Sequence, residues 1–325
     1  MFARAQFDQY AAARLALSHP LFGLAKRLPY RSLHHLLVGL TWLETWVRWP
    51  LKTMKMSDGL GEIFSTIDPR GDRFGLTPGV RRRFWRNRMY LELADLFVLL
   101  NGLDNAGFRK RALTVEGIET LLRERECGPG AIVLGFRLGV YPLIPLALGA
   151  LGYDVSMVVG GEPLAEMGQR LGERFAPRAA RRVRFLSAGD PLVLARCRDQ
   201  LSAGGLVSTL MELSPQRFAK TTPVQFLGWQ VHVPYGVPYL AAATGRSIVP
   251  ALFLREAGPR FRLRFLDPVP PPTDRGSVLE RTQQLYTLLE QQVRLHPDQW
   301  VGWTLLKSHL GVDIAAGQPD AVAAR

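Results

Sequence analysis

The sequence predicts an α/β fold, in which helices flank a mixed but largely parallel sheet, preceded by a helical extension. Two observations support this fold class. From residue 131 onward, short apolar runs are separated by helical patterns, and such alternation is typical of parallel α/β sheets. Before residue 128, apolar residues recur at helical spacing instead. The expected strands are residues 131–135, 155–159, 206–210, 224–226, 247–254 and 261–265.

Helix starts are predicted from capping residues. Thr77 followed by Pro78 is a typical N-cap and first-turn pair, and the apolar periodicity then continues to Gly102. A second helix is expected over residues 114–126, ending before Gly128. Later helices are predicted to start at Asp190-Pro191 and at a capping box formed by Ser277 and Glu280.

The chain is divided into three segments on this pattern. Residues 1–127 are expected to be helical, residues 128–310 to form the α/β core, and residues 311–325 to be a frayed tail. We find no linker or repeat between the first two segments, so they are expected to form one continuous domain. The stretch 138–153 is apolar but contains prolines and glycines, and it is interpreted as a buried core helix.

The chain is strongly basic. Its 41 Lys+Arg against 28 Asp+Glu give a formal net charge of +13, and nearly all of the basic residues are arginine. This excess predicts an anionic partner, which is a membrane surface, a phosphorylated ligand, an acidic carrier protein or a nucleic acid. Arginine-biased codon usage is the alternative. Two clusters are candidates for such contacts, or are solvated helix faces: residues 81–88, and Arg178, Arg181, Arg182 and Arg184.

Composition excludes several classes of protein. With 47% hydrophobic residues the chain is not intrinsically disordered. Cys127 and Cys197 are the two cysteines, which excludes a disulfide scaffold. Because they form no CxxC pattern, they are interpreted as buried thiols in a reducing compartment, and no metal or cofactor is expected. No helix-turn-helix, zinc or RNP-like motif supports nucleic-acid binding, so no nucleic-acid partner is expected.

A tryptophan-rich stretch lies near the N-terminus. Trp42, Trp46 and Trp49 fall on one helical face, with Lys26, Arg27 and Arg31 nearby. Tryptophan and arginine on a helix too short to span a bilayer are typical of an interfacial, monotopic element. The alternative is an amphipathic helix packed on the protein's own core. No uncharged apolar run reaches the roughly 18 residues that a spanning helix needs.

Four short motifs occur in a fixed order between residues 226 and 300. They are Phe226-Leu227-Gly228, Pro234-Tyr235-Gly236, Thr244-Gly245 followed by Ile248-Val249-Pro250, and Pro297 with Gln299 and Trp300. Together they resemble the lysophospholipid acyltransferase superfamily, most closely the bacterial lipid A biosynthesis (lauroyl/myristoyl) acyltransferase family. The resemblance covers roughly residues 80–305. It implies an acyltransferase-type sheet and acyl transfer from acyl-carrier protein or acyl-CoA to a phospholipid or glycolipid acceptor.

The catalytic pair of that family is missing. The resemblance implies a histidine base and, after four intervening residues, a glutamate at the end of the first strand. With Gly139 aligned, Arg137 and Pro142 stand at these two positions. Arginine stays protonated and proline has no ionisable group, so neither can take a proton. None of the chain's histidines is followed by Asp or Glu at this spacing.

Three residues are candidates to replace the lost base. His232 belongs to the loop that the resemblance places near the acceptor, Glu212 follows an expected strand, and Tyr141 lies about one helical turn from Arg137. Each also has an ordinary structural interpretation, as a loop histidine, a cap or ion pair, and a core residue. Arg137 itself is expected either to bind a phosphate or carboxylate or to form a structural ion pair. The positions that the resemblance implies for substrate binding are Arg137, Gly139, Phe226, Gly228, Pro234, Gly236 and Arg255.

Two functions remain open at this level. The first is a homologue of the acyltransferases with a non-standard or degenerate catalytic site. The second is a non-catalytic protein that keeps the fold and binds an acyl lipid or an acyl carrier. Whether the chain is an enzyme is therefore left open. Either function implies a peripheral or monotopic position on the cytoplasmic face of the inner membrane, with a cytoplasmic location as the alternative.

Overall fold

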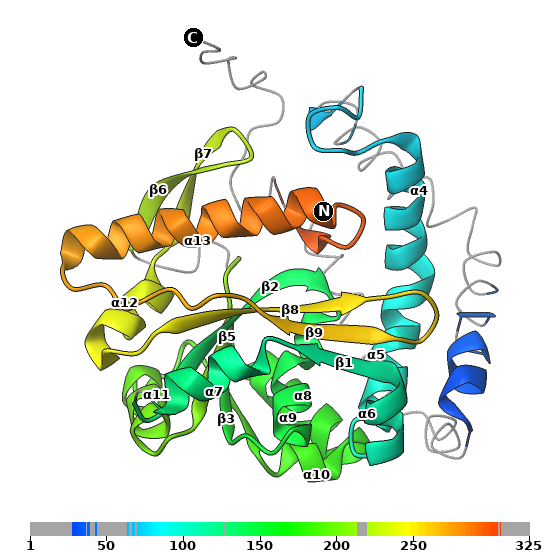
Figure 1. Cartoon of the computed structure of the whole chain (residues 1–325), viewed down its shortest axis with the longest axis horizontal. Coiled ribbons are helices and arrows are strands. Elements are labelled where there is room, and N and C mark those ends of the chain that lie inside the picture. Colours follow the sequence, from blue (N-terminus) through cyan, green and yellow to red (C-terminus); the bar gives the residue numbers. More distant parts are fainter. Residues whose placement is uncertain are drawn as a thin grey trace.

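A computed structural model describes residues 28–36, 38–39, 43, 64, 67–68, 70–126, 128–212, 220–304 and 306. Its centre is a seven-stranded sheet with the order β1-β9-β8-β2-β5-β3-β4, and a separate hairpin pairs β6 with β7 (Figure 1). The fold is thus mixed α/β, as predicted. The strands are β1 (Leu113–Glu116), β2 (Ala131–Gly139), β3 (Val155–Val159), β4 (Val183–Ser187), β5 (Leu206–Leu210), β6 (Thr221–Phe226), β7 (Trp229–Pro234), β8 (Ile248–Arg255) and β9 (Phe261–Phe265).

Five neighbouring strands of the sheet run parallel. β2 pairs in parallel with both β8 and β5, β5 pairs in parallel with β3, and β3 with β4. Only β9, antiparallel to β8, and its partner β1 run the other way. The carboxyl ends of β2, β5 and β8 therefore lie along one edge, here called the carboxyl edge, and the starts of β3 and β4 lie along the opposite, amino edge.

Helices cover both faces of the sheet. In Figure 1, α13 and α12 lie on one side of it, and α8, α9 and α10 lie on the other. Two buried apolar clusters correspond to these two layers, and alternate residues of β2 enter each of them. Apart from Arg137 near its end, the strand has no polar side chain, as expected for a parallel strand buried on both faces. The helices are α4 (Pro78–Arg86), α5 (Glu92–Gly102), α6 (Ala106–Ala112), α7 (Ile118–Glu126), α8 (Ile144–Ala150), α9 (Glu162–Phe175), α10 (Pro177–Ala180), α11 (Val193–Ser202), α12 (Gly236–Thr244) and α13 (Arg275–Leu295).

The helix predicted from Pro78 is present, with one irregularity. The Thr77 hydroxyl accepts a hydrogen bond from the Val80 N–H and caps the helix. A π-helical segment (Asn87–Leu91) separates α4 from α5, which ends at Gly102 as predicted. Such an insertion rotates the following turn, and π segments often accompany functional sites.

Residues 1–127 are not wholly helical, because β1 belongs to the main sheet. The predicted helix over residues 114–126 is wrong in its first turn, where β1 pairs with β9. Gly117 then separates strand from helix with φ of +70°, and a Cβ there would lie 2.3 Å from the Phe265 carbonyl oxygen. A four-residue strand is too short to reveal its period, so the helical pattern of α7 masked it.

Two other helix starts differ from the prediction. The Asp190-Pro191 pair precedes α11 rather than opening it, and the Asp190 carboxylate accepts the Leu192 N–H in a turn. The last long helix begins at Arg275, because Asp274 is the N-cap and Ser277 occupies the N3 position of the capping box. The capping box therefore lies about one helical turn before the predicted pair of Ser277 and Glu280.

The remaining sequence expectations have mixed outcomes. Residues 138–153 hold the end of β2, a 3₁₀ turn (Tyr141–Leu143) and the buried helix α8, so the expected core helix is shorter than the apolar run. Cys197 is buried, and burial raises the pKa of its thiol to about 11. Among the described residues, no helix is both long and apolar enough to cross a membrane. Trp42, Trp46, Trp49, Cys127 and the tail 311–325 lie outside the described residues.

Candidate functional site

The carboxyl edge brings Arg137 and Glu212 together. β2 runs parallel to β5 up to Gly135, and its register against β8 then shifts between Gly135 and Gly139. Arg137 lies in this irregular end of β2, and Glu212 follows the end of β5. The Arg137 backbone N–H donates to both carboxylate oxygens of Glu212, at 3.0 and 3.2 Å. The Arg137 Nε–H donates to the Glu212 carbonyl oxygen at 3.0 Å.

The Glu212 carboxylate is buried, and two N–H donors and one positive charge stabilise it. Glu212 is only 3% exposed, and the Trp300 indole N–H donates a hydrogen bond to its Oε1 at 2.8 Å. Burial raises the pKa of Glu212, while the charge of Arg137 and the hydrogen bonds from Trp300 and Arg137 oppose that rise. The arrangement fixes the carboxylate, whose oxygens already accept bonds from the protein.

Aromatic side chains pack around Arg137 and Glu212. Phe226 packs edge-to-face on Tyr286 and on Trp300, with ring centres 5.4 and 5.7 Å apart. The Tyr286 hydroxyl is buried and has no hydrogen-bond partner among the described residues. Tyr141 is also buried, and the Arg137 guanidinium carbon lies 5.9 Å from its ring centre. Burial raises the pKa of both tyrosines, so both phenols stay protonated near neutral pH.

Gly139 and Arg255 link the neighbouring strand ends to the C-terminal segment. Gly139 has φ of +60°, and a Cβ there would lie 2.3 Å from the Phe253 carbonyl oxygen, so the position requires glycine. Its N–H donates to the Gln299 carbonyl oxygen at 3.0 Å. The Gln299 side chain in turn exchanges two hydrogen bonds with the Arg255 backbone, at 2.9 and 3.0 Å. Gln299 and Trp300, singled out in the sequence, thus fasten the strand ends from outside the sheet.

A second buried charged cluster lies beside Arg255. The Arg255 Nε–H donates to Asp95, which is fully buried on α5. His34 Nε2 lies 3.2 Å from the other oxygen of Asp95, at ion-pair distance but without hydrogen-bond geometry. The His34 Nδ1 has no partner among the described residues. Arg255 was predicted from the sequence as a site residue, but Asp95 and His34 were not, because neither belongs to a recognisable motif.

The other predicted residues lie apart from the Arg137–Glu212 pair. Pro142 is exposed in the 3₁₀ turn, so it offers nothing at the position expected for glutamate. His232 is exposed on β7 between the buried Val231 and Val233, and points away from the core side of the hairpin. The hairpin turn contains Leu227, with φ of +54°, and Gly228, with φ of +82°. The two remaining positions flank the start of α12: Pro234 ends β7, and Gly236 opens the helix.

One small hollow lies at the carboxyl edge of the sheet. A hollow of about 20 Å³ lies among residues of α4–α5, Gly139, Arg255 and the C-terminal segment. That volume holds about one water molecule. Arg88 lines it and is paired with Glu92, four residues later on the π segment and α5.

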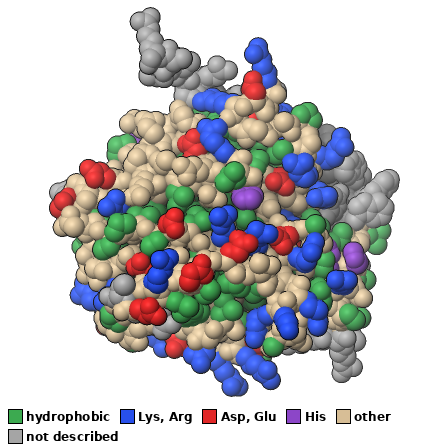
Figure 2. Space-filling model, in the orientation of Figure 1, with side chains coloured by type: hydrophobic (Ala, Val, Ile, Leu, Met, Phe, Trp, Pro, Cys, Tyr) green, Lys and Arg blue, Asp and Glu red, His purple; other side chains and the backbone are tan. Residues whose placement is uncertain are grey.

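Much of the predicted basic cluster 81–88 is also engaged within the protein. Arg81 donates to the carbonyl oxygens of Leu76 and Asp68, and Arg83 lies 3.6 Å from the Asp298 carboxylate. Lys and Arg side chains gather over α4, α6 and α10, at the right and lower margins of the face in Figure 2. The charge excess therefore combines internally paired arginines with solvent-facing ones.

Comparison with known proteins does not identify a family. No protein-family model matches the chain, and no curated protein matches it. The resemblance to the lipid A biosynthesis acyltransferases accordingly remains a hypothesis that rests on the short motifs and their order.

Proposed function

We propose that the protein is a catalytically degenerate homologue of the lipid A biosynthesis-type acyltransferases, which binds an acyl lipid or an acyl carrier without transferring the chain. One observation carries this proposal. Arg137 stands where the family's base is expected, and its backbone and side chain are both bonded to the buried Glu212. A guanidinium cannot accept the proton of an acceptor hydroxyl.

The other candidate bases are poorly placed for that proton transfer. A general base needs a free lone pair within hydrogen-bond reach of the substrate. The oxygens of Glu212 already accept bonds from Trp300 and Arg137. The Tyr141 phenol is buried and remains protonated, and His232 is exposed on the β6–β7 hairpin. These placements favour binding over turnover.

Arg137 also supports a binding role. Its side chain is half-buried, and its two terminal Nη groups make no hydrogen bond to the described residues. Guanidinium groups bind phosphate and carboxylate strongly because two N–H groups can reach two oxygens. In this proposal they hold the phosphate of a lipid headgroup or of an acyl carrier's prosthetic arm. A peripheral position on an anionic membrane surface belongs to the same proposal.

A transferase with a non-standard base is the second candidate. The raised pKa of Glu212 favours it, because burial brings a carboxyl group closer to the neutral range in which general bases work. Opening of the Trp300 contact during substrate binding would then be required.

A binding and transfer assay separates the two candidates. The full chain is incubated with acyl-carrier protein or acyl-CoA donors, and with phospholipid and glycolipid acceptors, while binding and product are both followed. We expect saturable binding without product, and weaker binding after Arg137→Gln but not after Arg198→Gln, an exposed arginine on α11. Turnover that disappears in Glu212→Gln would establish the transferase instead.

Two further outcomes bear on the proposal. An Arg137→His, Pro142→Glu double variant that gains transfer activity would indicate that the substrate groove of the family is retained. Absence of binding to every acyl ligand, in the wild type, would overturn both candidates.

A further inference from the structure

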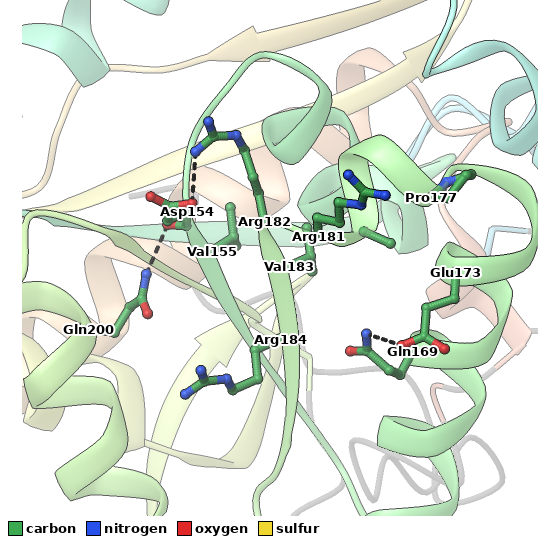
Figure 3. A pocket seen from close by; sticks show the side chains of 11 residues that line it. Asp154, Val155, Gln169, Glu173, Pro177, Arg181, Arg182, Val183, Arg184 and Gln200 are labelled. Carbon is green, nitrogen blue, oxygen red and sulfur yellow. Dashed lines mark hydrogen bonds and ion pairs between the residues drawn. The ribbon is translucent and has the colours of Figure 1, made fainter.

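A larger hollow lies at the opposite edge of the sheet. It has a volume of about 630 Å³ and opens at the amino ends of β3 and β4, between α9 and α11 (Figure 3). Small-molecule sites usually have volumes of a few hundred to about a thousand Å³. This edge is not where open α/β sheets usually bind ligands, so the hollow is independent of the function proposed above.

The walls of the hollow are held in place by hydrogen bonds. The Asp154 carbonyl oxygen accepts bonds from the Leu206 N–H at 2.8 Å and from Gln200 Nε2 at 3.0 Å. The Asp104 carboxylate, from the turn after α5, accepts the N–H groups of Arg178 and Ala179 at 2.7 and 2.8 Å and fixes α10. The pocket is therefore preformed, which lowers the entropic cost of ligand binding.

Positive charge in this hollow is only partly compensated. Arg182 is paired with Asp154 at 2.9 Å. By contrast, Arg181 and Arg184 line the hollow, and their side chains form no ion pair or hydrogen bond with any described residue. Figure 3 shows Arg181 extending toward Pro177 and Arg184 extending toward the side on which Gln200 lies. Glu173 remains as the other carboxylate, and it accepts a hydrogen bond from Gln169 at 2.8 Å.

We propose that this amino-edge pocket binds a small phosphate monoester. The unpaired Arg181 guanidinium, on the side of Gln169 and Glu173, provides N–H donors for the phosphate oxygens, and Arg184, on the side of Gln200, adds positive charge to the same hollow. The Glu173 carboxylate can accept hydrogen bonds from hydroxyl groups on the rest of the ligand, and the Gln169 amide can donate or accept them. Apolar surface from Val155 and Pro177 lines the same hollow and accommodates its carbon skeleton.

Binding of glycerol 3-phosphate to the full chain tests the proposal. Isothermal titration in buffer of physiological ionic strength is compared with sedimentation on phosphatidylcholine vesicles containing phosphatidic acid. Both probes carry a phosphate monoester, one free in solution and the other as a lipid headgroup. We expect saturable binding of one of them, weakened at least about tenfold by Arg181→Gln with Arg184→Gln, since each lost bond to a charged group weakens binding by about that factor.

The matched control removes the same charge from neighbouring surface. Arg170→Gln with Arg178→Gln changes two exposed arginines on α9 and α10 that do not line the hollow. Equal weakening by both double variants would reduce the effect to general electrostatics and overturn the proposal, as would failure of both probes to bind the wild type. Since the side chains of Arg181 and Arg184 make no bonds to the described residues, the thermal unfolding midpoint of their double variant should match that of the wild type. A matching midpoint excludes loss of folding as the cause of weaker binding.

Discussion

The two edges of the sheet use the same residue, arginine, in opposite ways. At the carboxyl edge, Arg255 is buried and bonded to the fully buried Asp95, and the half-buried Arg137 is tied to Glu212. At the amino edge, Arg182 and Asp154 form a pair whose side chains are 48% and 68% exposed. The side chains of Arg181 and Arg184 beside them have no partner among the described residues.

This difference follows from the cost of removing charge from water. A buried guanidinium is stable only if acceptors in the protein replace its hydration, whereas an exposed one keeps its water and needs no partner. The net charge of +13 therefore does not measure how many arginines can bind an anion. The carboxyl-edge arginines mainly hold the structure together, and those at the amino edge are available to a ligand.

Removing one acidic partner at each edge of the sheet should give the largest difference in the free energy of unfolding. We expect Asp95→Ala to lower the free energy of unfolding by about 3–5 kcal/mol, because it leaves the Arg255 charge buried without its partner. Asp154→Ala, which breaks an exposed pair, should cost at most about 1 kcal/mol. Urea unfolding of the two variants checks this. Equal losses would mean that burial does not distinguish the two edges.

The indole contact to Glu212 should have a smaller but measurable effect. Trp300→Phe removes the donor to a carboxylate, and Trp303→Phe removes a donor to the Pro297 carbonyl oxygen at the same distance of 2.8 Å. Both rings are fully buried, so the loss of packing is similar. Because hydrogen bonds to charged groups are stronger, Trp300→Phe should cost about 1 kcal/mol more than Trp303→Phe. A larger loss for Trp303→Phe would argue against a stabilising role for the Trp300–Glu212 bond.

The smallest expected effect is a pH dependence that comes from Glu212. Its pKa is raised by burial above the ordinary value of 4.5, so the folded protein binds a proton at this site more readily than the unfolded chain. Its contribution to stability is thus complete below about pH 4.5 and is lost as pH rises through the folded-state pKa. Relative to Glu212→Gln, the free energy of unfolding of the wild type should fall over that range and then level off.

Denaturant unfolding of both proteins at a series of pH values measures that difference, in which contributions from other groups largely cancel. A difference that instead rises with pH would show that the Arg137 charge outweighs burial and lowers the pKa of Glu212.

Most of the sheet could be predicted from local sequence. β3, β5 and β9 match the expected ranges, because a buried strand reads as a short apolar run. β1 and β4 were missed. β1 has only four residues beside a helical pattern, and β4 is an edge strand whose second residue, Arg184, interrupts its apolar run. Periodicity detects elements whose burial is uniform, and it fails where a strand is short or partly exposed.

The candidate site was predictable only in part. Glu212 was selected because it follows an expected strand, and Arg137 because the family resemblance places it at the position of the catalytic histidine. Their direct contact was not predictable, nor was the donor from Trp300, which lies 88 residues beyond Glu212. Asp95 was missed altogether, because its partner Arg255 is 160 residues away.

The sequence by itself determined the α/β class, the strongly basic charge and the lack of a histidine–carboxylate pair at the end of β2. These depend on residue type and short spacing, which folding does not change. Only the tertiary structure decided which arginines are neutralised and which remain open to an anion. That choice depends on burial and on partners brought together from distant parts of the chain. The Arg255 side chain meets Asp95, whereas Arg181 and Arg184 are exposed and their side chains bond to no described residue.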